Sequence, residues 1–251
     1  MAERPIAIAH RGSPASAPEN TLAGYLHALD AQADMIEVDI RVTVDGRVVL
    51  LHDAEVGGST DGAGDVSSLT FDQVRRLDAG AHRGGDFAGE RVPTLVEAVE
   101  AARGRAMLNL DIKDEAAIGP MVRDLRAQNA LRDVVVTGCT EAWAALVHAE
   151  EPALPVFLNM DAALREAATQ GSMALAEAGV GRALAAGLRG LNFHHGHVDA
   201  ELIRYAHARG VAVWTWTVDD TERTRELAAW GVDAVTSNDP AALMRTLGEL
   251  S

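Results

Sequence analysis

The chain has 251 residues and a formal net charge of -15 at pH 7, with 22 Lys and Arg against 37 Asp and Glu. This acidity argues against a nucleic-acid partner and against a polybasic membrane anchor, because both need clustered basic side chains. Hydrophobic residues make up 48% of the chain, which at this length is enough for a substantial core.

The composition also limits the compartment and the kind of metal site. Cys139 is the one cysteine, so we expect neither a disulfide framework nor a cysteine-based zinc site. The N-terminus has only a short apolar run, Ile6–Ala9, and does not resemble a signal peptide. No apolar stretch approaches the roughly 20 residues of a membrane helix. We therefore expect a soluble, cytoplasmic protein without stable membrane anchoring, whose oligomeric state the sequence does not indicate.

Short apolar runs alternate with helical patterns along the whole chain. We expect eight strands, at residues 5–9, 35–40, 107–112, 134–138, 155–159, 191–194, 211–218 and 234–236. The expected helices are residues 19–32, 93–103, 116–130, 141–150, 173–187, 200–209, 221–230 and 240–247. Such alternation predicts a parallel sheet, and eight units in about 250 residues favour an α/β fold of the (β/α)8 TIM-barrel type. An open, doubly wound sheet is the alternative.

We expect residues 1–251 to form a single domain. No linker, internal repeat or low-complexity tract divides the chain. Residues 54–104, between the second and third expected strands, are the one long excursion, and a small subdomain could protrude there.

The second expected strand carries two carboxylates, Glu37 and Asp39, at alternate positions. Residues two apart on a strand face the same side, so these like charges should lie side by side and need a positive charge between them. Asp45-Gly46 predicts a two-residue hairpin turn, which would place His52 opposite Asp39. The alternative is an exposed edge strand with His52 in a loop.

Further polar side chains occur at the ends of neighbouring expected strands. His10 and Arg11 follow the first strand, and Asn109, Asp111 and Lys113 alternate along the third. In a TIM barrel, functional residues gather at the C-terminal ends of the strands. These clusters should therefore meet the carboxylates of the second strand on one sector of the rim.

The expected cluster suits phosphate chemistry at a hard cation. Glu37, Asp39 and Asp111 form an oxygen-rich set suited to Mg²⁺ or Ca²⁺. Arg11 and Lys113 beside this acidic set indicate an anionic, small-molecule substrate, for which a phosphodiester is the usual fit.

Two histidines flank this set in the expected arrangement. His10 and His52 could act as general base and general acid near neutral pH. Taken alone, His10 is more typical of a structural loop residue, and Arg11 or Lys113 of a solvated charge. The interpretation depends on their convergence.

The order of these motifs resembles the glycerophosphodiester phosphodiesterase family, in particular its short bacterial members. The resemblance is carried by His10-Arg11-Gly12 with Pro18-Glu19-Asn20-Thr21, by Glu37-Val38-Asp39 with His52-Asp53, by Asn109-Leu110-Asp111-Ile112-Lys113, and by Trp216-Thr217-Val218.

The resemblance implies a TIM barrel that hydrolyses glycerophosphodiesters to sn-glycerol 3-phosphate and an alcohol with a divalent cation, Mg²⁺ or Ca²⁺. A glycerol hydroxyl or a water molecule could be the nucleophile. The implied roles are general acid and base for His10 and His52, metal ligation for Glu37, Asp39 and Asp111, and phosphate contact for Arg11 and Lys113. Trp216 would be an apolar wall for the glycerol carbons, or else an aromatic residue of the barrel core.

Three features depart from the family pattern. After His52-Asp53 the family often has an Arg-Thr-Thr run, and here Val56-Gly57-Gly58-Ser59-Thr60 lacks the arginine. Asp111 replaces the usual Glu, so its carboxylate is one methylene shorter, and Asp219 stands where Asn is common and adds negative charge near the mouth. A lysophospholipase D-like or cyclising enzyme of the same superfamily is one alternative function. A non-catalytic barrel that binds a phosphoester is another.

Overall fold

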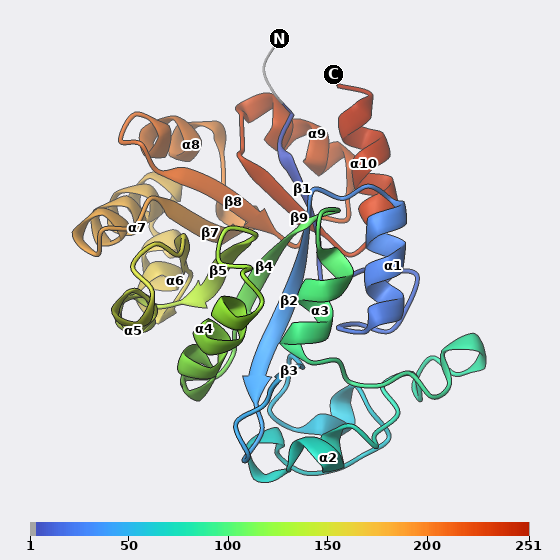
Figure 1. The fold of residues 1–251 in the computed structure, drawn as a ribbon. Coiled ribbons are helices and arrows are strands. Elements are labelled where there is room, and N and C mark those ends of the chain that lie inside the picture. The colour runs from blue at the N-terminus through green and yellow to red at the C-terminus, as the bar shows by residue number, and fades with distance from the viewer. Residues whose placement is uncertain (1–3, 251) are drawn as a thin grey trace.

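The computed structural model describes residues 4–250, in which a nine-stranded sheet is surrounded by helices (Figure 1). The strands are β1 (Ile6–Ala9), β2 (Met35–Val42), β3 (Val48–Leu50), β4 (Met107–Ile112), β5 (Val134–Cys139), β6 (Val156–Asn159), β7 (Gly190–His194), β8 (Ala212–Trp216) and β9 (Ala234–Ser237). All neighbouring pairs are parallel except β2–β3.

The sheet closes on itself because β1 pairs with β2 on one side and with β9 on the other. Eight parallel strands thus form a (β/α)8 TIM barrel, and β3 is an extra antiparallel strand attached to β2. The predicted fold class is confirmed, and the alternative of an open sheet is wrong.

Helices cover the outside of the barrel (Figure 1). They are α1 (Leu22–Asp30), α3 (Leu95–Ala102), α4 (Ile118–Ala127), α5 (Glu141–Glu150), α6 (Ala162–Thr169), α7 (Ser172–Ala185), α8 (Ala200–His207), α9 (Thr221–Trp230) and α10 (Pro240–Gly248), whereas the short helix α2 (Phe71–Val74) lies in the segment between β3 and α3. The sequence pattern did not predict α6. Leu164 is its one large apolar residue, so no spacing of large apolar residues marks the helix, and the Asp161 side chain caps its start by accepting from the Leu164 N–H.

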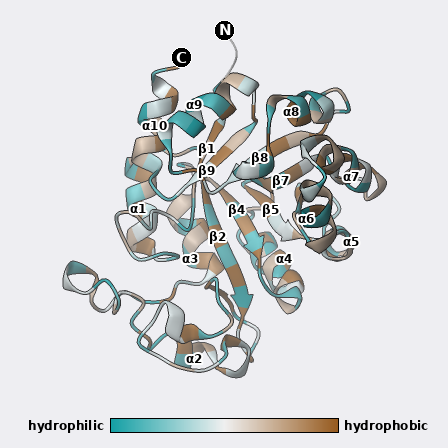
Figure 2. Cartoon of the chain, turned by 180° about the vertical axis from the view of Figure 1, so that it is seen from behind, coloured by the Kyte–Doolittle hydropathy of each residue, from teal (hydrophilic) through white to brown (hydrophobic). Residues whose placement is uncertain are grey.

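The alternation along β2 separates the core from the barrel interior. Ile36, Val38 and Ile40 belong to the main hydrophobic core, whereas Glu37 and Asp39 occupy the positions between them. Figure 2 shows this alternation as brown and teal bands along β2. The strand therefore packs apolar side chains against the helices and presents carboxylates on its opposite face.

The opposite end of the barrel from these carboxylates is closed by apolar side chains. A separate buried cluster there contains Ile8, Met35, Val135, Trp214 and Ala234, with Phe157 packed against it. The rings of Phe157 and Trp214 lie 4.0 Å apart at their centroids. Gly190 on the neighbouring strand makes this possible, since a Cβ on Gly190 would overlap with the Phe157 ring.

The hairpin between β2 and β3 differs from the prediction of a two-residue turn. Thr43 donates its N–H to the carbonyl of Arg47 at 3.0 Å, so three residues, 44–46, form the loop. Gly46 adopts the left-handed φ of 78° that the last position of such a loop favours. The Asp45 side chain stabilises the longer loop by accepting from the hydroxyl of Thr43 and from the N–H of Phe71.

The longer loop shifts the pairing by one residue. Ile40 pairs with Leu50, and the N–H of Leu51 donates to the carbonyl of Asp39 at 3.1 Å. The predicted pairing of His52 with Asp39 is therefore wrong, because Leu51 takes that position. His52 follows at the end of this arm and still reaches the barrel mouth, as described below.

Residues 51–94, between β3 and α3, lie beyond the C-terminal end of β2 (Figure 1). Their apolar side chains form a small separate cluster with Val49 of β3, made by Val49, Leu51, Val56, Val66, Val74, Ala79 and Val92. The segment returns to the barrel at α3, whose N-cap Thr94 forms a capping box with Glu97. The excursion is thus placed at the mouth of the barrel.

Across residues 4–250, no helix combines the length and the apolar character needed to cross a membrane.

We expect Gly190→Ala to destabilise the protein by about 1–3 kcal/mol, because the new methyl group forces the Phe157 ring out of its packing against Trp214. Urea denaturation followed by circular dichroism measures this change. Gly181→Ala is the matched control: Gly181 lies inside α7 with open space at its Cβ, so alanine should leave stability unchanged or raise it. Equal effects of the two substitutions would contradict this role of Gly190.

Candidate active site

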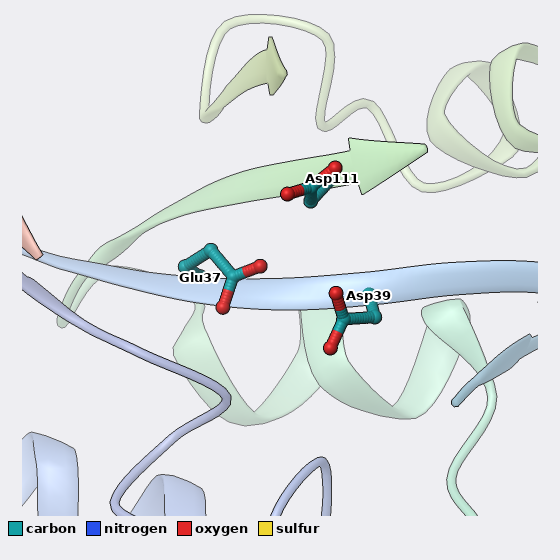
Figure 3. A group of neighbouring side chains, drawn as sticks. All are labelled: Glu37, Asp39 and Asp111. Atoms are coloured by element: carbon teal, nitrogen blue, oxygen red, sulfur yellow. The ribbon is translucent and has the colours of Figure 1, made fainter. Parts of the chain in front are cut away.

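Three carboxylates meet because two neighbouring strands are in register. β2 and β4 pair Asp39 with Asp111 and Glu37 with Asn109. Figure 3 shows Glu37 and Asp39 on β2 facing Asp111 on β4, and one oxygen from each carboxylate lies within 4.8 Å of the others. Glu37 and Asp39 are 4% and 1% exposed, so their charges are largely removed from water.

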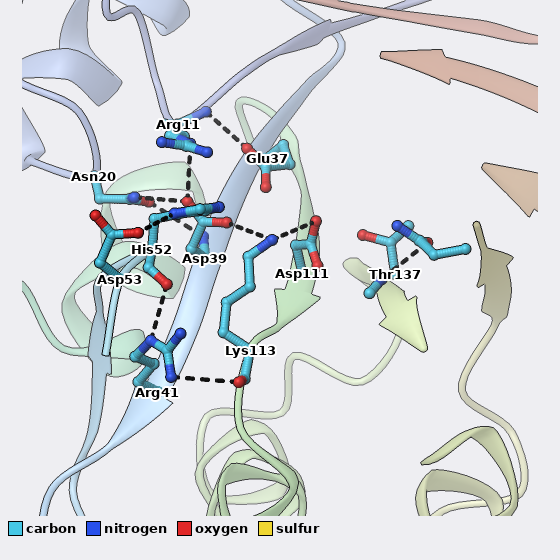
Figure 4. Close-up of polar contacts among 12 residues, drawn as sticks. Arg11, Asn20, Glu37, Asp39, Arg41, His52, Asp53, Asp111, Lys113 and Thr137 are labelled. Atoms are coloured by element: carbon cyan, nitrogen blue, oxygen red, sulfur yellow. Dashed lines mark hydrogen bonds and ion pairs between the residues drawn. The ribbon is translucent and has the colours of Figure 1, made fainter. Parts of the chain in front are cut away.

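Two cationic side chains offset this buried negative charge (Figure 4). Nζ of Lys113 lies 3.2 Å from both Oδ1 of Asp39 and Oδ2 of Asp111. Nε of Arg11 lies 3.1 Å from Oδ2 of Asp39, and the backbone N–H of Arg11 donates to Glu37 at 2.8 Å. The lysine and the arginine predicted beside the carboxylates therefore contact them directly.

The two predicted catalytic histidines reach the same cavity from different segments. Nδ1 of His10 lies 2.7 Å from the side-chain oxygen of Asn238, and Nδ1 of His52 lies 2.7 Å from Oδ1 of Asp53. In each ring Nδ1 is held by a neighbouring residue. This arrangement assigns proton exchange with a ligand to Nε2.

The site surrounds a cavity of about 200 Å³ at the C-terminal ends of the strands. Its lining residues are His10, Arg11, Glu37, His52, Asn109, Asp111, Lys113, Asn159, Asn192, Trp216, Thr217 and Thr236. Seven of the eight residues predicted for the site line this cavity, and the eighth, Asp39, lies beneath it in contact with Arg11 and Lys113. The structure therefore brings all the predicted residues together.

Comparison with known proteins agrees with this geometry. The model of the glycerophosphoryl diester phosphodiesterase family matches residues 10–242. The chain belongs to this family. A glycerophosphodiester phosphodiesterase of Caldanaerobacter subterraneus is 32% identical over 95% of this chain and 96% of its own length. Mouse glycerophosphodiester phosphodiesterase 1 is 47% identical, but over 45% of this chain and 35% of its own length.

Solved structures of the family share the fold along nearly the whole chain. An Oleispira antarctica phosphodiesterase, whose structure is in complex with the product sn-glycerol-3-phosphate, matches with a TM-score of 0.85, at 27% identity and with 98% and 97% of the two chains covered. These comparisons and the cavity make the chain an enzyme of the phosphoric diester hydrolase class. The alternative hypothesis of a non-catalytic barrel that only binds a phosphoester is therefore not supported.

Burial sets the protonation of the acidic cluster. Burial raises the pKa of Glu37 well above its usual range, and the charges of Asp39 and Asp111 raise it further. Burial acts in the same direction on Asp39, but Lys113 and Arg11 bring the pKa of Asp39 below its usual value. The pKa of Asp111 is raised, because burial outweighs its contact with Lys113. The two cations thus outweigh burial at Asp39 alone, and burial governs the pKa of Glu37 and of Asp111.

This cluster fits a hard divalent cation. Oδ1 of Asp111 is buried and accepts no hydrogen bond from any residue that the structure describes, so it is available as a ligand. Gly138 on β5 leaves room for it, since a Cβ there would overlap with the same oxygen. The shorter side chain of Asp111 thus still reaches the other two carboxylates. Glu37, Asp39 and Asp111 could hold the cation, and their oxygen donors suit either Mg²⁺ or Ca²⁺.

Sequence reasoning missed two residues that hold the site together. Asn20 donates its side-chain N–H to Oδ2 of Asp39 at 2.9 Å and accepts the N–H of Asp39 at 3.1 Å. Arg41 on β2 donates to the carbonyls of His52 and Lys113, at 2.9 and 3.3 Å, and so joins the two segments that carry them (Figure 4). The pattern does not indicate these contacts, because Asn20 falls at the start of the helix expected over residues 19–32.

Trp216 lies at the edge of the cavity and is half-buried. Its ring N–H donates to the carbonyl of Asn192 at 3.4 Å, and His194 packs edge-on against it at 5.5 Å between centroids. The aromatic residue of the barrel core is instead Trp214, which is 4% exposed. Trp216 is therefore placed where it can touch a ligand.

We expect Asp111→Asn to weaken divalent-cation binding about tenfold or more, because one anionic ligand is lost while shape is conserved. Gly138→Ala should weaken binding at least as much, because a Cβ there overlaps with Oδ1 of Asp111 and with the backbone of Ile112, at a left-handed φ of 75°. Isothermal titration calorimetry with Mg²⁺ and with Ca²⁺ measures binding, circular dichroism checks folding, and Gly181→Ala is the control. Unchanged affinity in folded Asp111→Asn protein would show that Asp111 is not a ligand.

Proposed function

We propose that this chain hydrolyses glycerophosphodiesters to sn-glycerol 3-phosphate and an alcohol, with a divalent cation and with His10 and His52 as the acid–base pair, and that residues 1–251 act as one catalytic domain. The observation that carries the proposal is the convergence of three carboxylates, two cationic side chains and two histidines on one cavity.

The lining of the cavity supports a glycerol-bearing substrate. The side of the mouth formed by β6, β7 and β8 presents the amides of Asn159 and Asn192 and the ring of Trp216. Amides can bind glycerol hydroxyls, and the indole can cover the glycerol carbons. The Oleispira neighbour in complex with sn-glycerol-3-phosphate supports the same substrate class.

The phosphate group would lie between this side and the acidic cluster. Arg11 and Lys113 line the cavity there and can hydrogen-bond phosphate oxygens. A divalent cation held by Glu37, Asp39 and Asp111 would supply fixed positive charge that offsets the negative charge of the phosphate in the transition state. Together these groups make the phosphorus accessible to an incoming oxygen.

His10 is suited to act as the base. Burial lowers the pKa of His10, so the neutral ring is favoured at neutral pH and can accept a proton at Nε2. In the proposed step the attacking oxygen forms a bond to phosphorus and gives its proton to His10. The bond between phosphorus and the alcohol oxygen breaks, and His52 protonates that oxygen.

Either a water molecule or the neighbouring glycerol hydroxyl can be the attacking group. The hydroxyl route gives a cyclic phosphate, which water then opens while the two histidines exchange roles. A lysolipid substrate is less well supported. The large exposed hydrophobic side chains among residues 4–250 are Ile6, Leu26, Val44, Met107, Leu146 and Leu250, and the cavity lining includes none of them.

We expect hydrolysis of glycerophosphocholine that stops in EDTA and returns with Mg²⁺ or Ca²⁺, because the buried carboxylates need a cation to bind phosphate. Release of sn-glycerol 3-phosphate, followed by a coupled enzymatic assay and by ³¹P NMR, measures it. Full activity in chelator would contradict the metal requirement, and a cyclic phosphate as the final product would favour the cyclising alternative.

We expect His10→Ala and His52→Ala each to lower kcat about 10²–10⁴-fold, because each removes one proton-transfer group. Equilibrium dialysis with sn-glycerol 3-phosphate should show that both variants still bind the product. His27→Ala, a change in α1 away from the cavity, is the control. Wild-type kcat in either active-site variant would remove that histidine from the mechanism.

A further inference from the structure

Asp219 lies outside the lining of the cavity and follows β8 in the chain, yet its carboxylate is bound to the segment that carries Asn238. Oδ1 accepts from the hydroxyl of Ser237 at 2.9 Å and from the backbone N–H of Asn238 at 2.8 Å. Oδ2 accepts from the side-chain amide of Asn238 at 2.7 Å. Both oxygens of Asp219 are therefore engaged by one short stretch of chain.

These contacts fix which way the Asn238 amide points. An ionised carboxylate can only accept hydrogen bonds, so the NH₂ group of Asn238 must face Asp219. The amide oxygen then faces His10, where it lies 2.7 Å from Nδ1. Because an amide oxygen can only accept, Nδ1 must carry the proton, and the lone pair of the neutral ring is left on Nε2.

We propose that Asp219 is a positioning residue which, acting through Asn238, selects the Nδ1–H tautomer of His10 and so keeps Nε2 ready to accept a proton. The inference rests on the proposed function, in which His10 is the base. It also gives a role to a residue that the sequence suggested only as extra negative charge near the mouth.

The substitution Asp219→Asn should reverse this chain of hydrogen bonds. The backbone N–H of Asn238 can only donate, so the amide oxygen of the new side chain must stay where Oδ1 is now. The new NH₂ group then faces Asn238, whose amide must turn to present its oxygen. Asn238 would consequently offer NH₂ to His10, which stabilises the tautomer with the proton on Nε2 and leaves no base there.

A second exchange should restore the original order. In Asp219→Asn combined with Asn238→Asp, the new carboxylate at position 238 accepts from the amide at position 219 and from Nδ1–H of His10. The single change Asn238→Asp instead places a carboxylate directly against Asp219 and should be harmful. If each single substitution lowers kcat and the double variant restores it, the two side chains act through one ordered chain of hydrogen bonds. Loss of surface charge alone would not give this pattern.

The tautomer can be measured without any assay of activity. Long-range ¹H–¹⁵N NMR on histidine-labelled protein distinguishes protonated from unprotonated ring nitrogens, and His10→Gln identifies the signals of His10. We expect Nδ1–H in the wild type and in the double variant, and Nε2–H in Asp219→Asn. An Nδ1–H tautomer in Asp219→Asn would overturn the inference whatever the enzyme hydrolyses.

Kinetics with glycerophosphocholine and Mg²⁺ provide the second measurement. For Asp219→Asn we expect kcat to fall about tenfold or more with KM little changed, and for the double variant we expect kcat to recover. Asp239→Asn, a like change at the N-cap of α10, should keep wild-type kcat, because it lies outside the chain to His10. Absence of turnover in the wild type would contradict the proposed function and leave the tautomer result standing, whereas wild-type kcat in Asp219→Asn would overturn the inference alone.

Discussion

The pairing of β2 with β4 in register is the constraint on which the site depends. It pairs Asp39 with Asp111, and Glu37 lies two residues before Asp39 on the same face of β2. Little water reaches this place to screen the three charges from one another. Burying like charges is costly unless opposite charges lie close. Lys113 lies between Asp39 and Asp111, and Arg11 contacts the far side of Asp39, so the cationic residues are part of what makes this register tolerable.

The same constraint explains why the cluster attracts an anionic substrate despite its acidity. Three carboxylates face two fixed cations, which is a formal excess of one negative charge when all three are ionised, and burial together with Asp39 and Asp111 raises the pKa of Glu37 against that state. A divalent cation held by these carboxylates would reverse that balance and make the cavity locally positive. The overall charge of -15 therefore says little about the ligand, because the local arrangement of charge decides what the mouth can bind.

Sequence periodicity was enough to predict the barrel, the strands and the sharing of one rim by β1, β2 and β4. It could not predict register. The pairing of β2 with β3 differs by one residue from the prediction, because the side chain of Asp45 stabilises a three-residue loop. The Asp45-Gly46 pair alone does not distinguish that loop from a two-residue turn. The helix α6 was not predicted because Leu164 is its one large apolar residue, which leaves no spacing to recognise. The role of Arg41 was not predicted because its partners are backbone carbonyls, which every residue type has.

The contact least visible in the sequence is that between His10 and Asn238, which lie 228 positions apart. It follows from closure of the barrel: β1 and β9 pair Ala9 with Ser237, so the next residue of each strand comes to the rim side by side. The N–H of His10 donates to the carbonyl of Ser237 at 2.9 Å, which holds the two segments together at that point. An open sheet with the same strands would separate these ends. The orientation of His10 is thus a property of the closed barrel as a whole, and the last strand orders a residue of the first.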